Sequence, residues 1–277
     1  MSYYVLCDSC TDFTAELRKD AHYQLVPLTL HIGEHDIVDD DTFDQKDFLK
    51  RVAEYPECPK SSCPSPESFL AYFSAVDEIY IVTLSSHLSG SYNSAVLAQK
   101  MYQEEHPDKK IHVFDSHTAS VGQTLIAMKI NELASQGLAF EQVVQQVDHF
   151  IAEQGTKFVL ETLEILRKNG RLSTVTATIA NVLNIKPVMT GISGKIDKLT
   201  QARGMNKAIH KMAEAIAADA VNPKEKILGI AHCNNLQRAQ QTKEEILKLV
   251  PFKDVYITDT AGISSLYAAD GGIVVSY

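Results

Sequence analysis

Two short apolar runs, each followed by a helical pattern, place the strongest constraint on how this chain can fold. The segments 78–84 (EIYIVTL) and 110–116 (KIHVFDS) are too short for buried helices and have the composition of buried strands. The helical pattern after the first run ends near Glu105, and the one after the second ends at Gly137. Strands that alternate with helices predict an α/β fold with a mostly parallel sheet and helices on both faces.

Other segments of the first half extend this pattern. A short strand is predicted at 3–7 (YYVLC), and a hairpin is predicted around Gly33 and Glu34. The helix 66–76 should begin with Ser65 as N-cap and Pro66 at its first position. A longer helix, 140–155, closes this half of the chain.

The pattern changes after Gly155, where we expect a domain boundary between residues 1–155 and residues 156–277. The second part predicts a helix closed by Gly170 and a hairpin around Ser193 and Gly194. The remaining predicted elements are the helix 206–220, the strand 226–233, the helix 236–250 and the strands 254–260 and 272–277. This order predicts a mixed α/β domain.

Composition excludes several classes of function. The 277 residues carry a formal net charge of −9, which disfavours binding to nucleic acids or anionic membranes through electrostatic attraction. No stretch reaches the ~18 uninterrupted apolar residues of a membrane helix, and the first residues lack the features of a signal peptide. We therefore expect a cytoplasmic protein.

Hydroxyl side chains gather where predicted strands meet helices. One junction, 83–91 (TLSSHLSGS), contains Ser89 and Gly90, and a second, 60–69 (KSSCPSPESF), contains Ser61 and Ser62. A third is 113–120 (VFDSHTAS). The carboxyl ends of parallel strands and the N-termini of helices favour anionic ligands, and glycine lets a ligand approach the backbone. These junctions predict a site for a ligand with a polar head, although each serine could also be a simple cap.

Two enzyme interpretations compete with a binding site. A hydrolase elbow at Ser89 requires glycines at positions that His87 and Ser91 occupy here, so this motif is absent. Cys7 and Cys10 (CDSC) have the spacing of a thioredoxin-like redox motif. A metal-binding α/β enzyme that uses Cys7 and Cys10, together with the other N-terminal cysteines Cys58 and Cys63, is a further alternative.

Several motifs together resemble the DegV family of bacterial fatty-acid-binding proteins, which are carrier subunits of the fatty acid kinase system. The longest match is TLSSHLSGSYNSAV at 83–96. Further matches are CDSCTDF, VPLTLHI, SSCPSPESF, LRKNGRLS, NIKPVMTGISGKI and ARGMNKAI, which extend over nearly the whole chain.

The resemblance implies a two-domain fold in which an acyl chain lies in an apolar tunnel between the domains. It implies that the hydroxyls of Ser61 and Ser89 hold the carboxylate of a long-chain fatty acid such as palmitate, with Arg203 near this network. Ser62 and Gly90 are neighbouring candidates from the hydroxyl-rich junctions. The expected partner is a separate kinase that forms an acyl phosphate. No catalysis by the chain itself and no cofactor are expected.

The sequence departs from the family pattern at three places. Ser61 replaces a threonine but keeps the hydroxyl, and Cys63 replaces a glutamine. A histidine that is common near the C-terminus of family members is absent, and Leu266 or Tyr267 stands in its place.

Overall fold

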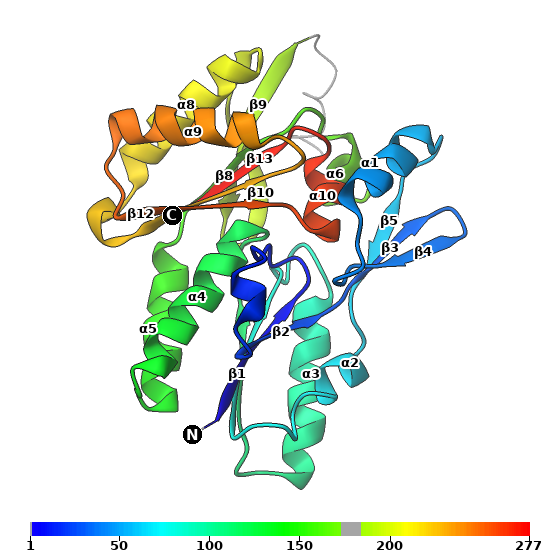
Figure 1. The fold of residues 1–277 in the computed structure, drawn as a ribbon, viewed down its shortest axis with the longest axis vertical. Helices are drawn as coiled ribbons and strands as arrows, with labels where there is room; N and C mark the ends of the chain where they lie inside the picture. The colour runs from blue at the N-terminus through cyan, green and yellow to red at the C-terminus, as the bar shows by residue number, and fades with distance from the viewer. Residues whose placement is uncertain (1, 173–183) are drawn as a thin grey trace.

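A parallel sheet forms the centre of the first half of the molecule. The computed structural model describes residues 2–172 and 184–277 (Figure 1). The strand order is β2-β1-β6-β7, and all pairs are parallel. The bounds are β1 Tyr3–Asp8, β2 Tyr23–Val26, β6 Glu78–Thr83 and β7 Lys110–Asp115. The strand runs predicted at 3–7, 78–84 and 110–116 are confirmed.

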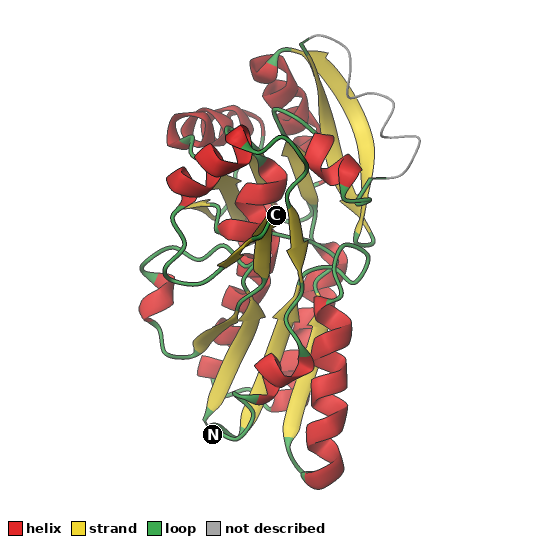
Figure 2. Ribbon diagram, turned by 90° about the vertical axis from the view of Figure 1, so that its right-hand side faces the viewer, coloured by secondary structure: helices red, strands yellow, loops and turns green. Residues whose placement is uncertain are grey.

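Helices cover both faces of this sheet (Figure 2), because its strands carry apolar side chains on each face. Val5, Tyr80 and Val82 pack in one cluster with residues of α4 and α5, whereas Ile79 and Ile81 pack with residues of α2 and α3. The helices are α2 Pro66–Leu70, α3 Ser91–Glu105, α4 Val121–Ser135 and α5 Phe140–Glu153, and a 3-10 turn, η1, spans Leu17–Lys19.

Helix α2 is shorter than the predicted helix 66–76. Its regular part ends at Leu70, and the backbone continues in tighter turns, in which Tyr72 N–H donates to the Phe69 carbonyl and Phe73 N–H donates to the Leu70 carbonyl. These turns keep Phe69 and Phe73 buried under the sheet. The predicted helix is therefore present, but its regular part is shorter than predicted.

A small antiparallel sheet projects beside the parallel one, with strand order β4-β3-β5. The hairpin predicted around Gly33 is confirmed, whereas β5 and α1 are elements that the sequence did not predict. The bounds are β3 Thr29–Ile32, β4 His35–Val38, β5 Lys60–Ser62 and α1 Gln45–Glu54. Ser61 and Ser62 therefore lie on an edge strand that ends shortly before α2, so they stand before a helix as predicted.

The second half contains a six-stranded mixed sheet with strand order β10-β9-β8-β13-β11-β12. Helices α8 and α9 pack against it through a shared apolar core (Figure 1). The strands are β8 Thr156–Val159, β9 Ile185–Ile192, β10 Lys195–Arg203, β11 Ile227–His232, β12 Asp254–Asp259 and β13 Ile273–Ser276. The helices are α6 Glu164–Lys168, α8 Met205–Asp219, α9 Leu236–Leu249 and α10 Gly262–Ala268, and a 3-10 turn, η2, spans Pro223–Glu225.

The tip of the β9–β10 hairpin contacts the first half of the chain. Ser193 and Gly194 form the turn with φ values of 47° and 81°. The buried Ser85 hydroxyl donates to the Gly194 carbonyl over 2.8 Å. A β-carbon at residue 194 would lie 2.4 Å from that hydroxyl oxygen, so this contact needs glycine.

The predicted fold class is confirmed: a parallel sheet with flanking helices is followed by a mixed α/β part. The predicted elements missed α10, which packs against α1, α6 and β3. Among residues 2–172 and 184–277, no helix combines the length and the apolar composition needed to cross a bilayer.

Candidate functional site

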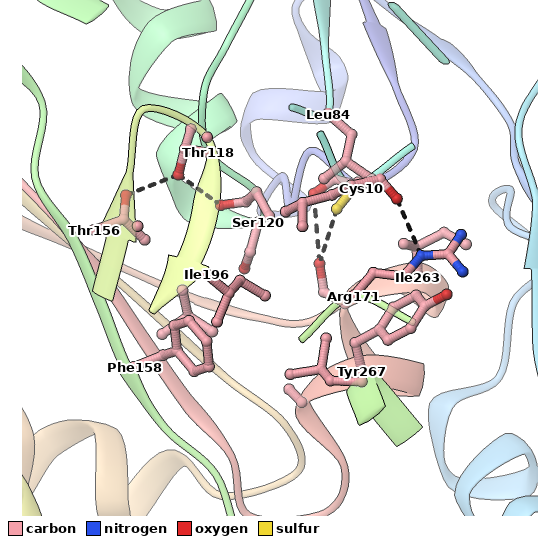
Figure 3. Close-up of a pocket in the computed structure, with 18 of the residues that line it drawn as sticks. Cys10, Leu84, Thr118, Ser120, Thr156, Phe158, Arg171, Ile196, Ile263 and Tyr267 are labelled. Carbon is pink, nitrogen blue, oxygen red and sulfur yellow. Dashed lines mark hydrogen bonds between the residues drawn. The ribbon is translucent and has the colours of Figure 1, made fainter. Parts of the chain in front are cut away.

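An apolar cavity lies where the carboxyl ends of the parallel strands face the second half of the molecule (Figure 3). Its walls come from the loops after β1, β6 and β7, from β8, from α10 and from the tip of the β9–β10 hairpin. Its volume is about 100 Å³, which is several times what one buried water needs. Its apolar wall residues include Leu84, Phe158, Leu160, Leu166, Ile196 and Ile263.

One end of this cavity carries polar groups. The hydroxyl of Tyr267 lies 3.0 Å from Oγ of Ser61, and the Arg171 guanidinium lies 5.9 Å from the centre of the Tyr267 ring. Arg171 Nε donates to the Leu88 carbonyl over 3.1 Å. Figure 3 shows Tyr267 and Arg171 together on one side of the cavity. Two hydroxyls and one guanidinium form a set of donors that suits a carboxylate.

The N-terminus of α3 lies next to this polar end. Ser89 Oγ accepts a hydrogen bond from Ser91 N–H over 3.2 Å, and Gly90 is the N-cap residue. A β-carbon on Gly90 would lie 3.0 Å from Sγ of Cys63, so the segment that carries Ser61 passes close to the start of the helix. The structure therefore brings Ser61, Ser89 and Gly90 into one region next to the cavity, and their roles in ligand binding stay predictions.

None of the five predicted site residues is among the residues that line the cavity. Ser61, Ser89 and Gly90 lie beside its polar end, whereas Ser62 and Arg203 lie elsewhere. Ser62 points away from Ser61 along β5 and bonds to His31. Arg203 is exposed at the far end of β10, whereas Lys195 and Ile196 at the near end line the cavity. The eight steps of extended strand from Lys195 to Arg203 span roughly 26 Å. Ligand roles for Ser62 and Arg203 stay predictions.

Ser62 belongs to a row of three hydrogen-bonded side chains across the small sheet. Its Oγ lies 2.9 Å from Nε2 of His31, whose Nδ1 lies 2.6 Å from Oδ1 of Asp36. Serine hydrolases use the same order of residues. Here the Asp36 side chain is 68% exposed, and none of the three residues lines the apolar cavity. The row therefore gives no support to a hydrolase.

The cysteine-based alternatives find little support. Cys7 and Cys10 are buried free thiols, and the sulfur of Cys10 lies 3.7 Å from Oγ of Ser264. Burial raises the pKa of both thiols, and the neighbouring Asp8 carboxylate raises it further. Because the thiolate is the reactive form, these surroundings oppose redox chemistry. Within the part of the chain that the structure describes, no group of three or more His, Cys, Asp or Glu residues is placed to hold a metal ion.

Hydroxyls of the third junction lie at the opposite side of the cavity (Figure 3). Thr118 Oγ1 lies 2.8 Å from Oγ1 of Thr156, and Thr156 Oγ1 lies 3.1 Å from Oγ of Ser276. These hydroxyls satisfy one another, so this side of the cavity is closed without an unpaired hydroxyl group. The junctions 83–91 and 113–120 thus contribute residues to the cavity wall, whereas the junction 60–69 reaches the cavity only through the contact of Ser61 with Tyr267.

Sequence reasoning did not assign Arg171 and Tyr267 to the site. Arg171 lies in the motif LRKNGRLS, and Tyr267 occupies a position that the sequence comparison marked as a departure. The motif and the departure from the family pattern thus marked both residues. The two side chains come together only through α10, which the sequence did not predict. Ser173, the last residue of that motif, lies outside the described residues.

Known proteins place this chain in a family. The family model described as "Uncharacterised protein, DegV family" matches residues 2–277. The chain belongs to the DegV family. A DegV domain-containing protein from Streptococcus gordonii is 33% identical over 280 residues, which cover 100% of this chain and 99% of that protein.

Two solved structures of DegV proteins are especially similar. A DegV family protein from Ruminococcus gnavus, refined with vaccenic acid, is 47% identical and has a TM-score of 0.96, with 100% of both chains covered. The fatty acid kinase (Fak) B3 protein of Streptococcus pneumoniae, loaded with linoleic acid, is 34% identical. Its TM-score is 0.92, and the match covers 100% of this chain and 99% of that one.

Proposed function

We propose that this DegV protein binds one long-chain fatty acid, such as palmitate, with the acyl chain in the apolar cavity. The carboxylate would lie at the polar end formed by Ser61, Tyr267 and Arg171, next to Ser89 and Gly90 at the start of α3. The observation that carries the proposal is an apolar cavity with a guanidinium and the bonded hydroxyls of Tyr267 and Ser61 at one end. A molecule with a long apolar chain and one anionic head has the matching chemistry.

Magnitudes assign different tasks to the two parts of the site. Burying an alkyl chain contributes ~0.8 kcal/mol per methylene, so a long acyl chain offers on the order of 10 kcal/mol before the costs of association. One hydrogen bond to a charged group contributes ~1.5–3 kcal/mol. The cavity therefore sets the affinity, and the polar end fixes the orientation of the ligand and prevents an unpaired buried carboxylate.

The ligands of related proteins support this proposal. The Ruminococcus gnavus and Streptococcus pneumoniae proteins carry vaccenic and linoleic acid in structures that superpose on this chain over its full length. Both ligands are long-chain acids with one carboxylate. We extend their chemical class, and not their individual preferences, to this chain.

We further propose residues 1–155 and 156–277 as two domains that enclose the ligand. The first supplies the loops after β1, β6 and β7, and the second supplies β8, α10 and the hairpin tip. On this division, an acyl chain in the cavity contacts both domains. Ligand binding should then stabilise the two domains together.

We infer a separate kinase as the partner. The B3 protein is named as part of a fatty acid kinase, and a carboxylate at the polar end would lie close to the exposed Gly90 and Cys63. In this scheme the kinase phosphorylates the carboxylate, and the chain itself performs no chemistry on the bound lipid. The chain would act as a carrier without a cofactor.

The test uses the purified protein, labelled palmitate and a fatty acid kinase with Mg-ATP. We expect saturable palmitate uptake by the protein alone. Acyl phosphate, trapped as the hydroxamate with hydroxylamine, should form only when the kinase is present. Failure to take up palmitate would refute the binding proposal, whereas uptake without hydroxamate would refute the kinase partnership alone.

A further inference from the structure

Helix α10 forms one wall of the cavity, and its first turn is held by two carboxylates. The N–H of Ala261 donates to Oδ1 of Asp12 over 2.7 Å. The N–H of Gly262 donates to Oδ1 of Asp39 over 2.7 Å, and the N–H of Ile263 donates to Oδ2 of Asp39 over 2.9 Å. Three of the N–H groups that a helix start leaves without intrahelical partners are thus satisfied by charged acceptors.

Both carboxylates come from the first half of the chain and are almost fully buried. Asp12 follows β1 and is 0% exposed, and Asp39 follows β4 and is 2% exposed. Asp12 also accepts from the Ser120 hydroxyl over 2.5 Å, and Asp39 accepts from the Ser9 hydroxyl over 2.9 Å. These bonds come from residues outside α10, so they hold the orientation of each carboxylate independently of the helix.

The fit leaves no free space at this contact. A β-carbon on Gly262 would lie 2.5 Å from Oδ1 of Asp39. Five residues further along α10, Tyr267 reaches Ser61 at the polar end of the cavity. A shift of the first turn would therefore move the wall residues Ile263 and Tyr267 together, because they lie on the same short helix.

We propose that Asp12 and Asp39 are positioning residues for the lipid site, which hold α10 in the place where Tyr267 meets Ser61. This inference rests on the proposed function, because the consequence for a ligand depends on a fatty acid in the cavity. It assigns a role to two residues that do not belong to the polar end. Neither carboxylate contacts the proposed position of the ligand.

Charged and titratable groups surround the two carboxylates. The Arg18 guanidinium lowers the pKa of Asp39, and the Asp39 carboxylate raises that of Asp12. The Cys10 thiol and the Tyr256 phenol also lie near Asp12. Burial raises the pKa of Asp12 to about 7 and that of Asp39 to about 6.

Two effects act on the carboxylates where α10 docks. Burial raises both pKa values, whereas the α10 N–H groups that donate to the carboxylates lower them. The contact is therefore tested most directly through the acceptor oxygens. Asp8 is a third buried carboxylate in this region, but it bonds to Leu84 N–H and Gln123 and does not contact α10.

Asp39→Asn is the most informative substitution. The amide keeps the size of the carboxylate but has one acceptor oxygen, so one of the two α10 N–H groups then faces an NH₂ donor. Gln45→Ala is the matched control. Gln45 donates to the Thr260 carbonyl over 2.8 Å and to Oγ of Ser265 in α10 over 3.1 Å, but it is not an acceptor for the N–H groups of the first turn.

The experiment measures hydrogen exchange of the α10 amides in the ligand-free protein at pH 7, corrected for intrinsic exchange rates. Protection at Gly262 and Ile263 should be about tenfold lower in Asp39→Asn than in the parent, and Gln45→Ala should keep the protection of the parent. Protection at Ala239 in α9 should stay unchanged in both variants, which shows that they are folded. Asp12→Asn should lower the protection of Ala261 in the same way. Palmitate should also dissociate about tenfold faster from Asp39→Asn than from the parent at pH 7.

The two parts of the experiment separate the two proposals. Equal protection of these amides in the parent and in both aspartate variants would overturn the positioning role even if palmitate binds. Unchanged palmitate dissociation from a folded Asp39→Asn protein would also overturn it. If the parent takes up no palmitate but the variants show the expected exchange, the proposed function fails and the contact between the carboxylates and α10 stands.

Discussion

The hydroxyl of Tyr267 lies 3.0 Å from the hydroxyl of Ser61, although 206 positions separate the two residues in the sequence. One hydroxyl comes from α10 and the other from the edge strand β5 of the small sheet. Their contact defines the polar end of the cavity. It also ties the C-terminal part of the chain to the segment next to the start of α3.

Removal of either hydroxyl should weaken the binding of a fatty acid. We expect Ser61→Ala and Tyr267→Phe each to cost ~1–3 kcal/mol in the binding of palmitate, because each removes one donor to the carboxylate. The double variant should lose less than the sum, since the two hydroxyls share a bond. Isothermal titration with palmitate and with hexadecanol measures these differences, and the alcohol should be much less affected.

A control for these variants is Ser65→Ala, which removes an exposed hydroxyl that makes no side-chain cap bond to α2. It should bind palmitate as the parent does. If Ser61→Ala and Tyr267→Phe also bind as the parent does, the carboxylate has been placed at the wrong end of the cavity.

The hairpin tip should control access to the cavity. Gly194→Ala meets two obstacles, a φ of 81° and a β-carbon position 2.4 Å from the Ser85 hydroxyl. We expect a loss of ~1–3 kcal/mol in unfolding free energy and faster exchange of bound palmitate. Denaturant unfolding and stopped-flow displacement measure the two effects.

Gly137→Ala provides a matched comparison for the hairpin variant. Gly137 has a φ of 79°, but a β-carbon there would meet no atom within 4 Å. This variant should lose stability through backbone strain and keep the palmitate exchange rate of the parent. Equal exchange rates in both glycine variants would show that the hairpin tip does not limit access.

The cysteines should differ sharply in reactivity. Cys63 is exposed, whereas Cys7 and Cys10 are buried and have raised pKa values. In the folded protein, iodoacetamide should modify Cys63 much faster than it modifies Cys7 and Cys10. Peptide mass spectrometry reads the sites, and rapid modification of Cys10 in the native protein would revive the redox interpretation.

Stability should depend on pH through Asp12 and Asp39. Both pKa values are raised by burial, to about 7 and about 6, so the folded state binds protons more strongly than the unfolded state. The unfolding free energy contributed by these two groups should therefore fall as pH rises from about 4 to about 7. Urea unfolding of the parent and of Asp12→Asn across this range should show a smaller pH dependence in the variant. Identical pH profiles would contradict the assignment.

Sequence patterns predicted most of the regular elements because short apolar runs mark the buried strands and the longer segments between them have helical patterns. Strands β1, β6 and β7 and helices α3, α8 and α9 are examples. The patterns did not predict α10, because its seven residues are buried on nearly all sides and the helix has no polar face. Edge strand β5 has three residues and no apolar alternation, so its pairing with β3 is a tertiary property.

The candidate site shows the same division. Ser61, Ser89 and Gly90 stand in recognisable motifs, and the structure brings them into one region. Arg171 and Tyr267 joined them only through the packing of α10 and the segment after α6. A sequence pattern does not report how these elements meet in space.

The central claim is that this chain holds a long-chain fatty acid in the cavity, and native mass spectrometry of the purified protein tests it most directly. Protein purified from bacteria should carry one long-chain fatty acid per chain, released by organic extraction and identified by its mass. Lipid-free protein that also fails to take up added palmitate would contradict the account.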